Sequence, residues 1–201
     1  MDSSEKLNWF SSELNTLAKF DSGVKTAAEL FIEELPDYFF VVPASSSGKH
    51  HAKFASGEHG LLNHTKAAFY VAEELFQNPM FNCFNGDKRK EALALLAILL
   101  HDGCKRGMKN ESEEHTQFDH PILAASFIDA HSSDKIKMVL SGDEIEFLKS
   151  LVLTHMGPWT ISKYAKEVLS APATDAQKFV HLCDYIASRE RLEFRIKGST
   201  D

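Results

Sequence analysis

The sequence has few cysteines and no apolar run long enough to cross a membrane. Its 201 residues include Cys83, Cys104 and Cys183, with no CxxC spacing. An odd number without paired spacing indicates neither a disulfide framework nor a zinc knuckle, and it suits a reducing compartment. The longest apolar stretch, residues 92–100, is far shorter than the roughly 20 residues of a membrane helix. The first ten residues also lack the basic and apolar regions of a signal peptide. We therefore expect a cytoplasmic protein with no membrane association.

The chain also lacks an excess of basic residues. It has 22 Lys and Arg against 29 Asp and Glu, which gives a formal net charge of -7. Proteins that bind duplex nucleic acid neutralise its phosphates with Lys and Arg, so this class of partner is not expected. A small anionic ligand is compatible with the composition if metal ions supply local positive charge.

Apolar residues recur every three or four positions along most of the chain, which predicts helices nearly throughout. We expect helices at residues 5–20, 24–35, 61–77, 88–101, 119–131, 143–156 and 174–195, and an extended segment at 38–46. The helix containing residues 92–100 is apolar on all sides, so it belongs at the centre. The expected fold class is an all-α, single-domain helical bundle. Trp9, Phe10 and the Phe39–Phe40 pair suit either the core or an interface. A homo-oligomer is therefore compatible with the sequence.

Six potential metal ligands fall on the apolar stripes or at the ends of the predicted helices. A single histidine on such a stripe is more commonly a hydrogen-bonded core residue. The combination of imidazoles and carboxylates aimed inward from five helices instead favours a divalent metal, for which both are common ligands. The six residues are His64, His101, Asp102, His120, His155 and Asp184.

The order of these residues resembles the H...HD...D signature of the HD-domain metal-dependent phosphohydrolases. The likeness rests on the segments GLLNHT, LLHDGCK, DHPILAASFI, LTHMGPW and FVHLCDYIASR, and it covers residues 60–191. His120 and His155 occupy the places where the two-metal branch carries further histidines, the H...HD...H...H...D subset. That subset includes phosphodiesterases of cyclic dinucleotides, dinucleoside polyphosphate hydrolases and the HD domain of a bacterial exoribonuclease. Two features depart from the family: Cys104 replaces the glycine of HDxGK, and no GYP motif supports the cyclic di-GMP branch.

The resemblance implies an HD-type bundle that holds two divalent ions, from among Mn, Fe, Co, Ni, Zn and Mg, which activate a water molecule. Asp102 would bridge the two ions. The first ion would be bound by His64, His101, Asp102 and Asp184, and the second by Asp102, His120 and His155.

Other residues near these ligands are candidates for catalysis and substrate binding. Lys105 would bind phosphate or protonate the leaving oxygen, although an exposed lysine in a polar loop is an equal alternative. Trp159 offers a flat face for a nucleobase, although an aromatic there is more often simply core. The loop before His64 contributes three further candidate substrate ligands, Ser47, Lys49 and His51.

The expected function is hydrolysis of a phosphoester or phosphodiester in a small nucleotide-like substrate or a short oligonucleotide. One alternative is a mononuclear 5'-nucleotidase or deoxynucleoside triphosphate triphosphohydrolase, in which His120 and His155 bind substrate phosphate. Another is a non-catalytic HD-fold sensor that binds a nucleotide. We expect residues 60–195 to form the phosphohydrolase core, residues 1–59 to pack on it as N-terminal helices and a substrate-side loop, and residues 196–201 to form a tail.

Overall fold

The computed structural model describes residues 1–45, 52–109, 115–163 and 167–192. These parts of the chain contain nine α-helices, two 3₁₀ turns and no β-strand, so the predicted all-α class is confirmed. The helices are α1 (Ser3–Trp9), α2 (Ser11–Phe20), α3 (Ser22–Glu34), α4 (Gly60–Gln77), α5 (Lys88–Leu100), α6 (His120–His131), α7 (Asp134–Lys137), α8 (Gly142–Leu153) and α9 (Asp175–Ala187). The 3₁₀ turns are η1 (Asp37–Phe40) and η2 (Lys53–Ala55).

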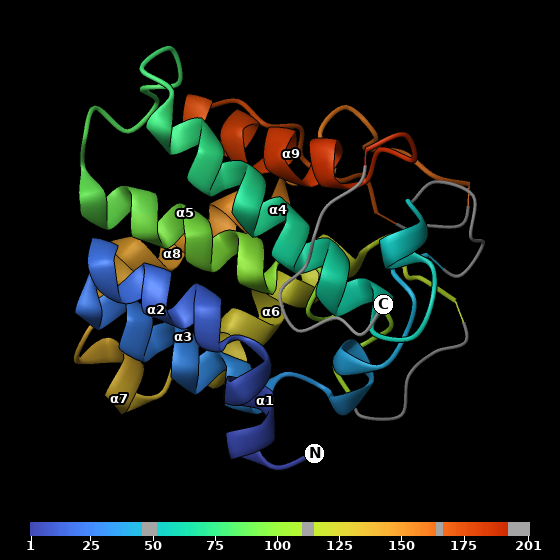
Figure 1. The fold of residues 1–201 in the computed structure, drawn as a ribbon, viewed down its shortest axis with the longest axis horizontal. Helices are drawn as coiled ribbons and strands as arrows, with labels where there is room; N and C mark the ends of the chain where they lie inside the picture. The colour runs from blue at the N-terminus through green and yellow to red at the C-terminus, as the bar shows by residue number, and fades with distance from the viewer. Residues whose placement is uncertain (46–51, 110–114, 164–166, 193–201) are drawn as a thin grey trace.

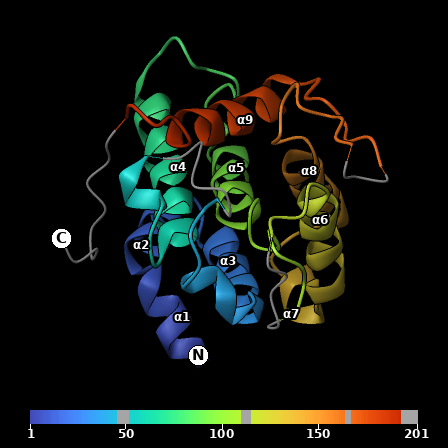
Figure 2. The same cartoon turned by 90° about the vertical axis from the view of Figure 1, so that its right-hand side faces the viewer.

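Helix α5 lies at the centre of the bundle (Figure 1), as its apolar sequence predicts. Residues 92–100 are almost completely buried, and α5 contacts α2, α3, α4, α8 and α9. Figure 2 shows α9 lying across α4, α5 and α8. Helices α1 to α3 lie on one side of the central helix α5, and α6 and α8 lie on the other. Because one continuous hydrophobic core runs from Phe10 to Ala187, the N-terminal helices pack on the same core as α9.

Polar side chains at the helix starts explain several of the boundaries. Thr174 and Gln177 form a capping box at the start of α9, in which the Thr174 side chain accepts from the Gln177 N–H. The Asp21 carboxylate accepts from Gly23 and Val24 at the start of α3. These side chains satisfy backbone donors that have no partner within the helix, and they fix where each helix begins.

The extended segment predicted at residues 38–46 is wrong, because residues 37–40 form the turn η1. An extended strand would place neighbouring side chains on opposite faces, whereas Tyr38, Phe39 and Phe40 are all buried in the core. Phe10 packs within 6.1 Å, centroid to centroid, of both Phe39 and Phe40. These three phenylalanines are therefore core residues of the chain.

Three helix boundaries also differ from the predictions. The helix expected at residues 5–20 divides at Phe10 into α1 and α2, where the buried ring anchors the break. Helix α8 ends at Leu153, not at 156. Helix α9 ends at Ala187, not at 195, because the side chains of Ser188 and Arg189 both donate to the Tyr185 carbonyl and close the last turn. The short helix α7 was not predicted.

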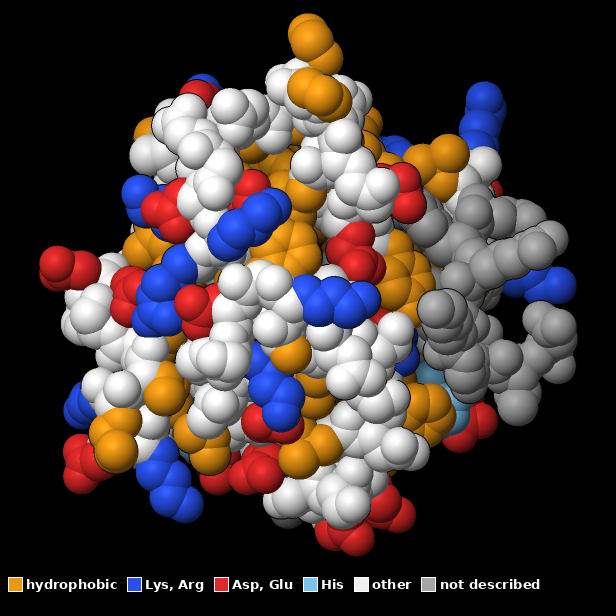
Figure 3. Space-filling model, turned by 60° about the vertical axis from the view of Figure 1, so that its left-hand side comes forward, with side chains coloured by type: hydrophobic (Ala, Val, Ile, Leu, Met, Phe, Trp, Pro, Cys, Tyr) orange, Lys and Arg blue, Asp and Glu red, His pale blue; other side chains and the backbone are white. Residues whose placement is uncertain are grey.

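The surface shown in Figure 3 carries acidic and basic side chains beside one another, with no broad patch of one sign on that face. None of the described helices combines the length and apolar character needed to cross a membrane.

Candidate metal centre

The six predicted ligands lie together at one end of α5. His64 lies on α4 and Asp184 on α9, while His101 and Asp102 form the turn that follows α5. His120 is the first residue of α6. His155 lies in the turn after α8, whereas the predicted boundary at residue 156 placed it within the helix. All six side chains are buried except that of Asp184, which is 20% exposed.

Oδ2 of Asp102 belongs to a first group of ligand atoms. It lies 3.5 Å from Nε2 of His64 and 3.4 Å from Nε2 of His101. The same two nitrogens lie 3.0 and 3.6 Å, respectively, from Oδ1 of Asp184. His64, His101 and Asp184 therefore offer donor atoms close enough together to hold one metal ion.

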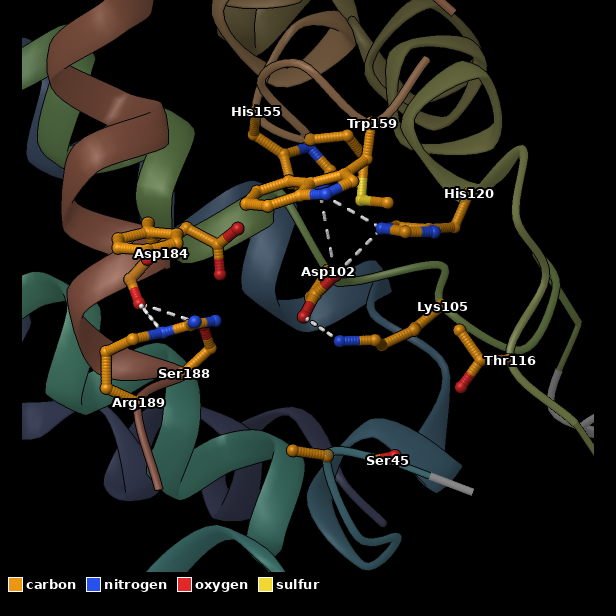
Figure 4. A pocket seen from close by; sticks show the side chains of 13 residues that line it. Ser45, Asp102, Lys105, Thr116, His120, His155, Trp159, Asp184, Ser188 and Arg189 are labelled. Carbon is orange, nitrogen blue, oxygen red and sulfur yellow. Dashed lines mark hydrogen bonds and ion pairs between the residues drawn. The ribbon is translucent and has the colours of Figure 1, made fainter. Parts of the chain in front are cut away.

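Oδ1 of Asp102 faces a second group of ligand atoms. It lies 3.1 Å from Nε2 of His120 and 3.7 Å from Nε2 of His155, and the two Nε2 atoms are 3.0 Å apart (Figure 4). His155 also forms a possible metal-binding set with His101 and Asp102. The two oxygens of one carboxylate thus point to two separate pairs of histidines.

The protonation of these histidines leaves acceptor atoms facing one another. Nδ1 of His101, His120 and His155 lies 2.6 to 2.7 Å from the backbone carbonyls of residues 98, 117 and 152. Because a carbonyl oxygen only accepts, each Nδ1 must carry the proton, and Nε2 of a neutral ring then presents a lone pair. Nδ1 donation to a carbonyl is also the arrangement that orients metal-bound histidines in proteins.

This donor set fits divalent metal ions. Nε2 of His101 and Oδ1 of Asp102 are buried without a hydrogen-bond partner among the described residues. Lone pairs of neutral imidazoles and of carboxylates that converge at these distances repel one another unless a proton or a metal cation lies between them. Mixed imidazole and carboxylate ligands suit first-row transition metals.

The charges within the cluster reflect this crowding. Burial lowers the pKa of His101, but Asp102 and Asp184 raise it by more, to about 10. Burial, reinforced by His101 and His120, lowers the pKa of His155 to about 3. Burial acts to raise the pKa of Asp102, yet Lys105 and His101 hold it well below its usual value. A proton on His101 and the Lys105 ammonium therefore both offset the charge of the carboxylates.

Neighbouring turns hold the ligands in place. The Tyr38 hydroxyl donates to the Gly107 carbonyl at 2.5 Å and accepts from the Arg106 N–H at 3.0 Å, which fixes the turn after Asp102. Gly157 lies in the turn that follows α8 and has φ +65°. A Cβ at this position would meet the His181 ring at 2.2 Å. Nδ1 of His181 in turn donates to the His155 carbonyl at 2.7 Å. Pro158 follows and cannot continue a helix.

A cavity of about 560 Å³ opens beside the cluster. Its wall includes Asp102, His120, His155 and Asp184, so one side of the ligand set faces the cavity. His64 and His101 are not among the residues that line it. The other lining residues are Ala44, Ser45, Lys105, Thr116, Met156, Trp159, Tyr185, Ser188 and Arg189.

The predicted substrate ligands have different outcomes. Lys105 and Trp159 line the cavity, and Nζ of Lys105 lies 2.5 Å from Oδ2 of Asp102, so it is not the exposed lysine of the alternative prediction. Ser47, Lys49 and His51 lie outside the described residues. The residues on the α9 side of the cavity were not predicted. Their spacing in the sequence could have indicated them, because Ser188 and Arg189 come about one helical turn after Asp184.

Comparison of the chain with protein-family models, with curated proteins and with solved structures gives no match.

Proposed function

We propose that this chain is a metal-dependent phosphohydrolase of the HD-domain type that holds two divalent ions and cleaves a phosphoester or phosphodiester of a nucleotide-like substrate. The observation that carries the proposal is the position of Asp102. Its two oxygens face different histidine pairs, as a carboxylate that bridges two ions must. The resemblance of the ordered motifs to that family supports the same conclusion.

Six residues would hold the ions, in the two sets described above. Bound ions would supply a water molecule of lowered pKa and would neutralise the phosphate oxygens. Asp102, His120, His155 and Asp184 line the cavity and so would lie beside the substrate. The burial of the cluster excludes bulk water from one side, which strengthens every electrostatic interaction there.

Lys105 would act on the substrate from the cavity floor. Its ammonium contacts Asp102 and offsets the carboxylate charge, and its side chain lines the cavity. The ammonium would bind a phosphate oxygen or donate a proton to the leaving oxygen.

The experiment is hydrolysis of bis(4-nitrophenyl) phosphate and of 4-nitrophenyl phosphate with Mn²⁺ and with EDTA. We expect metal-dependent release of 4-nitrophenol, reduced on the order of a thousandfold or more in Asp102→Asn. His131→Ala is the matched control, because His131 ends the helix that His120 begins and contacts Glu34, far along α6 from the cluster. No hydrolysis by the metal-loaded wild type would instead favour the non-catalytic sensor.

A second candidate, a mononuclear nucleotidase or triphosphohydrolase, has one observation in its favour. His120 and His155 line the cavity, whereas His64 and His101 are not among its lining residues. Each of these rings already donates its Nδ1–H to a backbone carbonyl, so it would hydrogen-bond a phosphate only in the imidazolium form, with a second proton on Nε2. In that case the protein would bind one ion, and monoesters or triphosphates would be cleaved in preference to diesters.

A further inference from the structure

Three side chains form a continuous wall along the α9 side of the cavity: Trp159, Tyr185 and Arg189. The Trp159 and Tyr185 rings are stacked, with centroids 5.8 Å apart and planes inclined by 11°. The guanidinium carbon of Arg189 lies 3.9 Å from the Tyr185 centroid. Tyr185 therefore contacts both an aromatic ring and a cation. Figure 4 shows Trp159 and Arg189 among the residues that line the cavity with Asp184.

The guanidinium of Arg189 is held in position but not neutralised. Its Nε donates to the Tyr185 carbonyl at 3.0 Å, and one terminal nitrogen donates to the Ser188 hydroxyl at 2.8 Å. Arginine has five N–H donors, and in the described part of the chain these contacts and the Tyr185 ring are all that Arg189 has. A fixed guanidinium with donors to spare is suited to bind a phosphate group with two hydrogen bonds.

The indole of Trp159 is similarly fixed but uncovered. It is 51% exposed, although its ring contacts both Tyr185 and His181. The large core rings of this chain, such as Phe39 and Phe69, are fully buried. A rigid exposed aromatic at the edge of a polar cavity is a surface on which a nucleobase can stack.

We propose that this wall is a nucleotide subsite, in which Trp159 stacks with the base and Arg189 binds a phosphate oxygen. The Tyr185 ring contacts both groups, with its centroid 5.8 Å from that of Trp159 and 3.9 Å from the guanidinium carbon of Arg189. The subsite selects nucleoside phosphates over phosphorylated sugars or amino acids. This inference rests on the proposed function, because it places the phosphate to be cleaved beside Asp184 and the metal cluster.

The test measures binding of adenosine 5'-monophosphate, adenosine and ribose 5-phosphate in EDTA, so that turnover cannot consume the ligand. The chain has two tryptophans, Trp9 and Trp159, so Trp9→Phe leaves Trp159 as the sole fluorescent indole. We expect the nucleotide to quench this fluorescence and to bind at least about tenfold more tightly than ribose 5-phosphate. Adenosine should quench it with lower affinity than the nucleotide.

Variants separate the two halves of the subsite. Trp159→Ala should weaken nucleotide binding by calorimetry about tenfold to a hundredfold and leave ribose 5-phosphate binding unchanged, while Trp159→Phe should retain most of the affinity. Arg189→Gln should weaken both phosphates about tenfold to a hundredfold and leave adenosine unchanged. Arg191→Gln is the charge-matched control, because Arg191 is exposed and does not line the cavity.

Equal affinity of the wild type for the nucleotide and ribose 5-phosphate would overturn the subsite. So would unchanged nucleotide binding in Trp159→Ala, even if the metal-loaded protein hydrolyses phosphodiesters. Conversely, base-dependent binding that needs Trp159 and Arg189 would support the subsite even if no hydrolysis were found, and only the proposed reaction would then fail.

Discussion

Charged side chains occur in two kinds of setting in this chain, and the settings differ in how donors and acceptors are arranged. On the N-terminal side, Arg89 donates to the carboxylates of Asp21 and Glu144 and to the Val139 carbonyl. Lys6 likewise donates to the carbonyls of residues 33 and 35 and pairs with Asp37. In both networks the chain itself supplies the counter-charge.

The cluster of six predicted ligands is built differently. Four imidazoles and two carboxylates converge, and among the described residues Lys105 is the one ammonium or guanidinium group that contacts them. Each burial of an unbalanced acceptor costs free energy. The contrast teaches that the Arg89 and Lys6 networks are complete in themselves, whereas the cluster brings together imidazole and carboxylate atoms of the kind that could hold a metal ion.

The largest expected effect concerns the response of stability to metal. Mn²⁺ at about 100 times the Kd of each of two sites should stabilise the wild type by about 5 kcal/mol, about 2.7 kcal/mol per ion, and raise its Tm by about 10–20 °C. Arg89→Met should show the same increase from a lower starting Tm, while Asp102→Asn should show little. Thermal unfolding with and without Mn²⁺ checks this. An equal Mn²⁺ response in Asp102→Asn would mean that the ions bind elsewhere.

A smaller effect is expected where the backbone positions His155. Gly157→Ala should lower the free energy of unfolding by about 2 kcal/mol, because φ is +65° and the added Cβ would strike the His181 ring. It should also weaken Mn²⁺ binding, since His181 holds the His155 carbonyl. Gly142→Ala is the control, because a Cβ there meets nothing within 4 Å. Equal stability of both variants in urea titrations would contradict this account of the turn.

The smallest effect concerns the Arg89 network and depends on pH. The hydrogen bond from Arg89 lowers the pKa of Glu144 to about 2, and the pKa of Asp21 is lowered as well. A carboxylate with a lowered folded-state pKa stabilises the fold above its unfolded pKa, about 4.5 for Glu, and loses this as pH falls toward 2. Arg89→Met should therefore cost about 1–2 kcal/mol at pH 7.

That difference from the wild type should shrink steadily between pH 4.5 and 3, as measured by urea unfolding. A difference that stays constant with pH would assign the loss to packing of the Arg89 side chain instead. The control is Lys90→Met, which removes an exposed pair with Asp87 and should change stability by less than about 0.5 kcal/mol.

Helices and ligand candidates could be predicted from the sequence because both depend on local periodicity. The apolar run at residues 92–100 indicated the central helix, and the stripes around His64 and Asp184 indicated inward positions. The position of His155 beyond α8 was not predicted. It depends on the contact between Gly157 and His181, which lie on different segments.

The contacts between the side chains of the cavity wall could not be predicted from local pattern either. Arg189 follows the apolar stripe of α9 in the sequence. In the helix predicted at residues 174–195 it would be an exposed residue. Its position against Tyr185 results from the end of α9 at Ala187. Trp159 was a candidate from its chemistry alone, and its stacking on Tyr185 arises only when the segment after α8 packs on α9.

Metal stoichiometry tests the central claim most directly. The wild type and His155→Ala would be reconstituted with Mn²⁺, desalted and measured by elemental analysis, with His131→Ala as control. We predict two ions per chain in the wild type and in His131→Ala, and one in His155→Ala. No bound ion in the wild type would contradict the claim that this acceptor cluster is a metal centre.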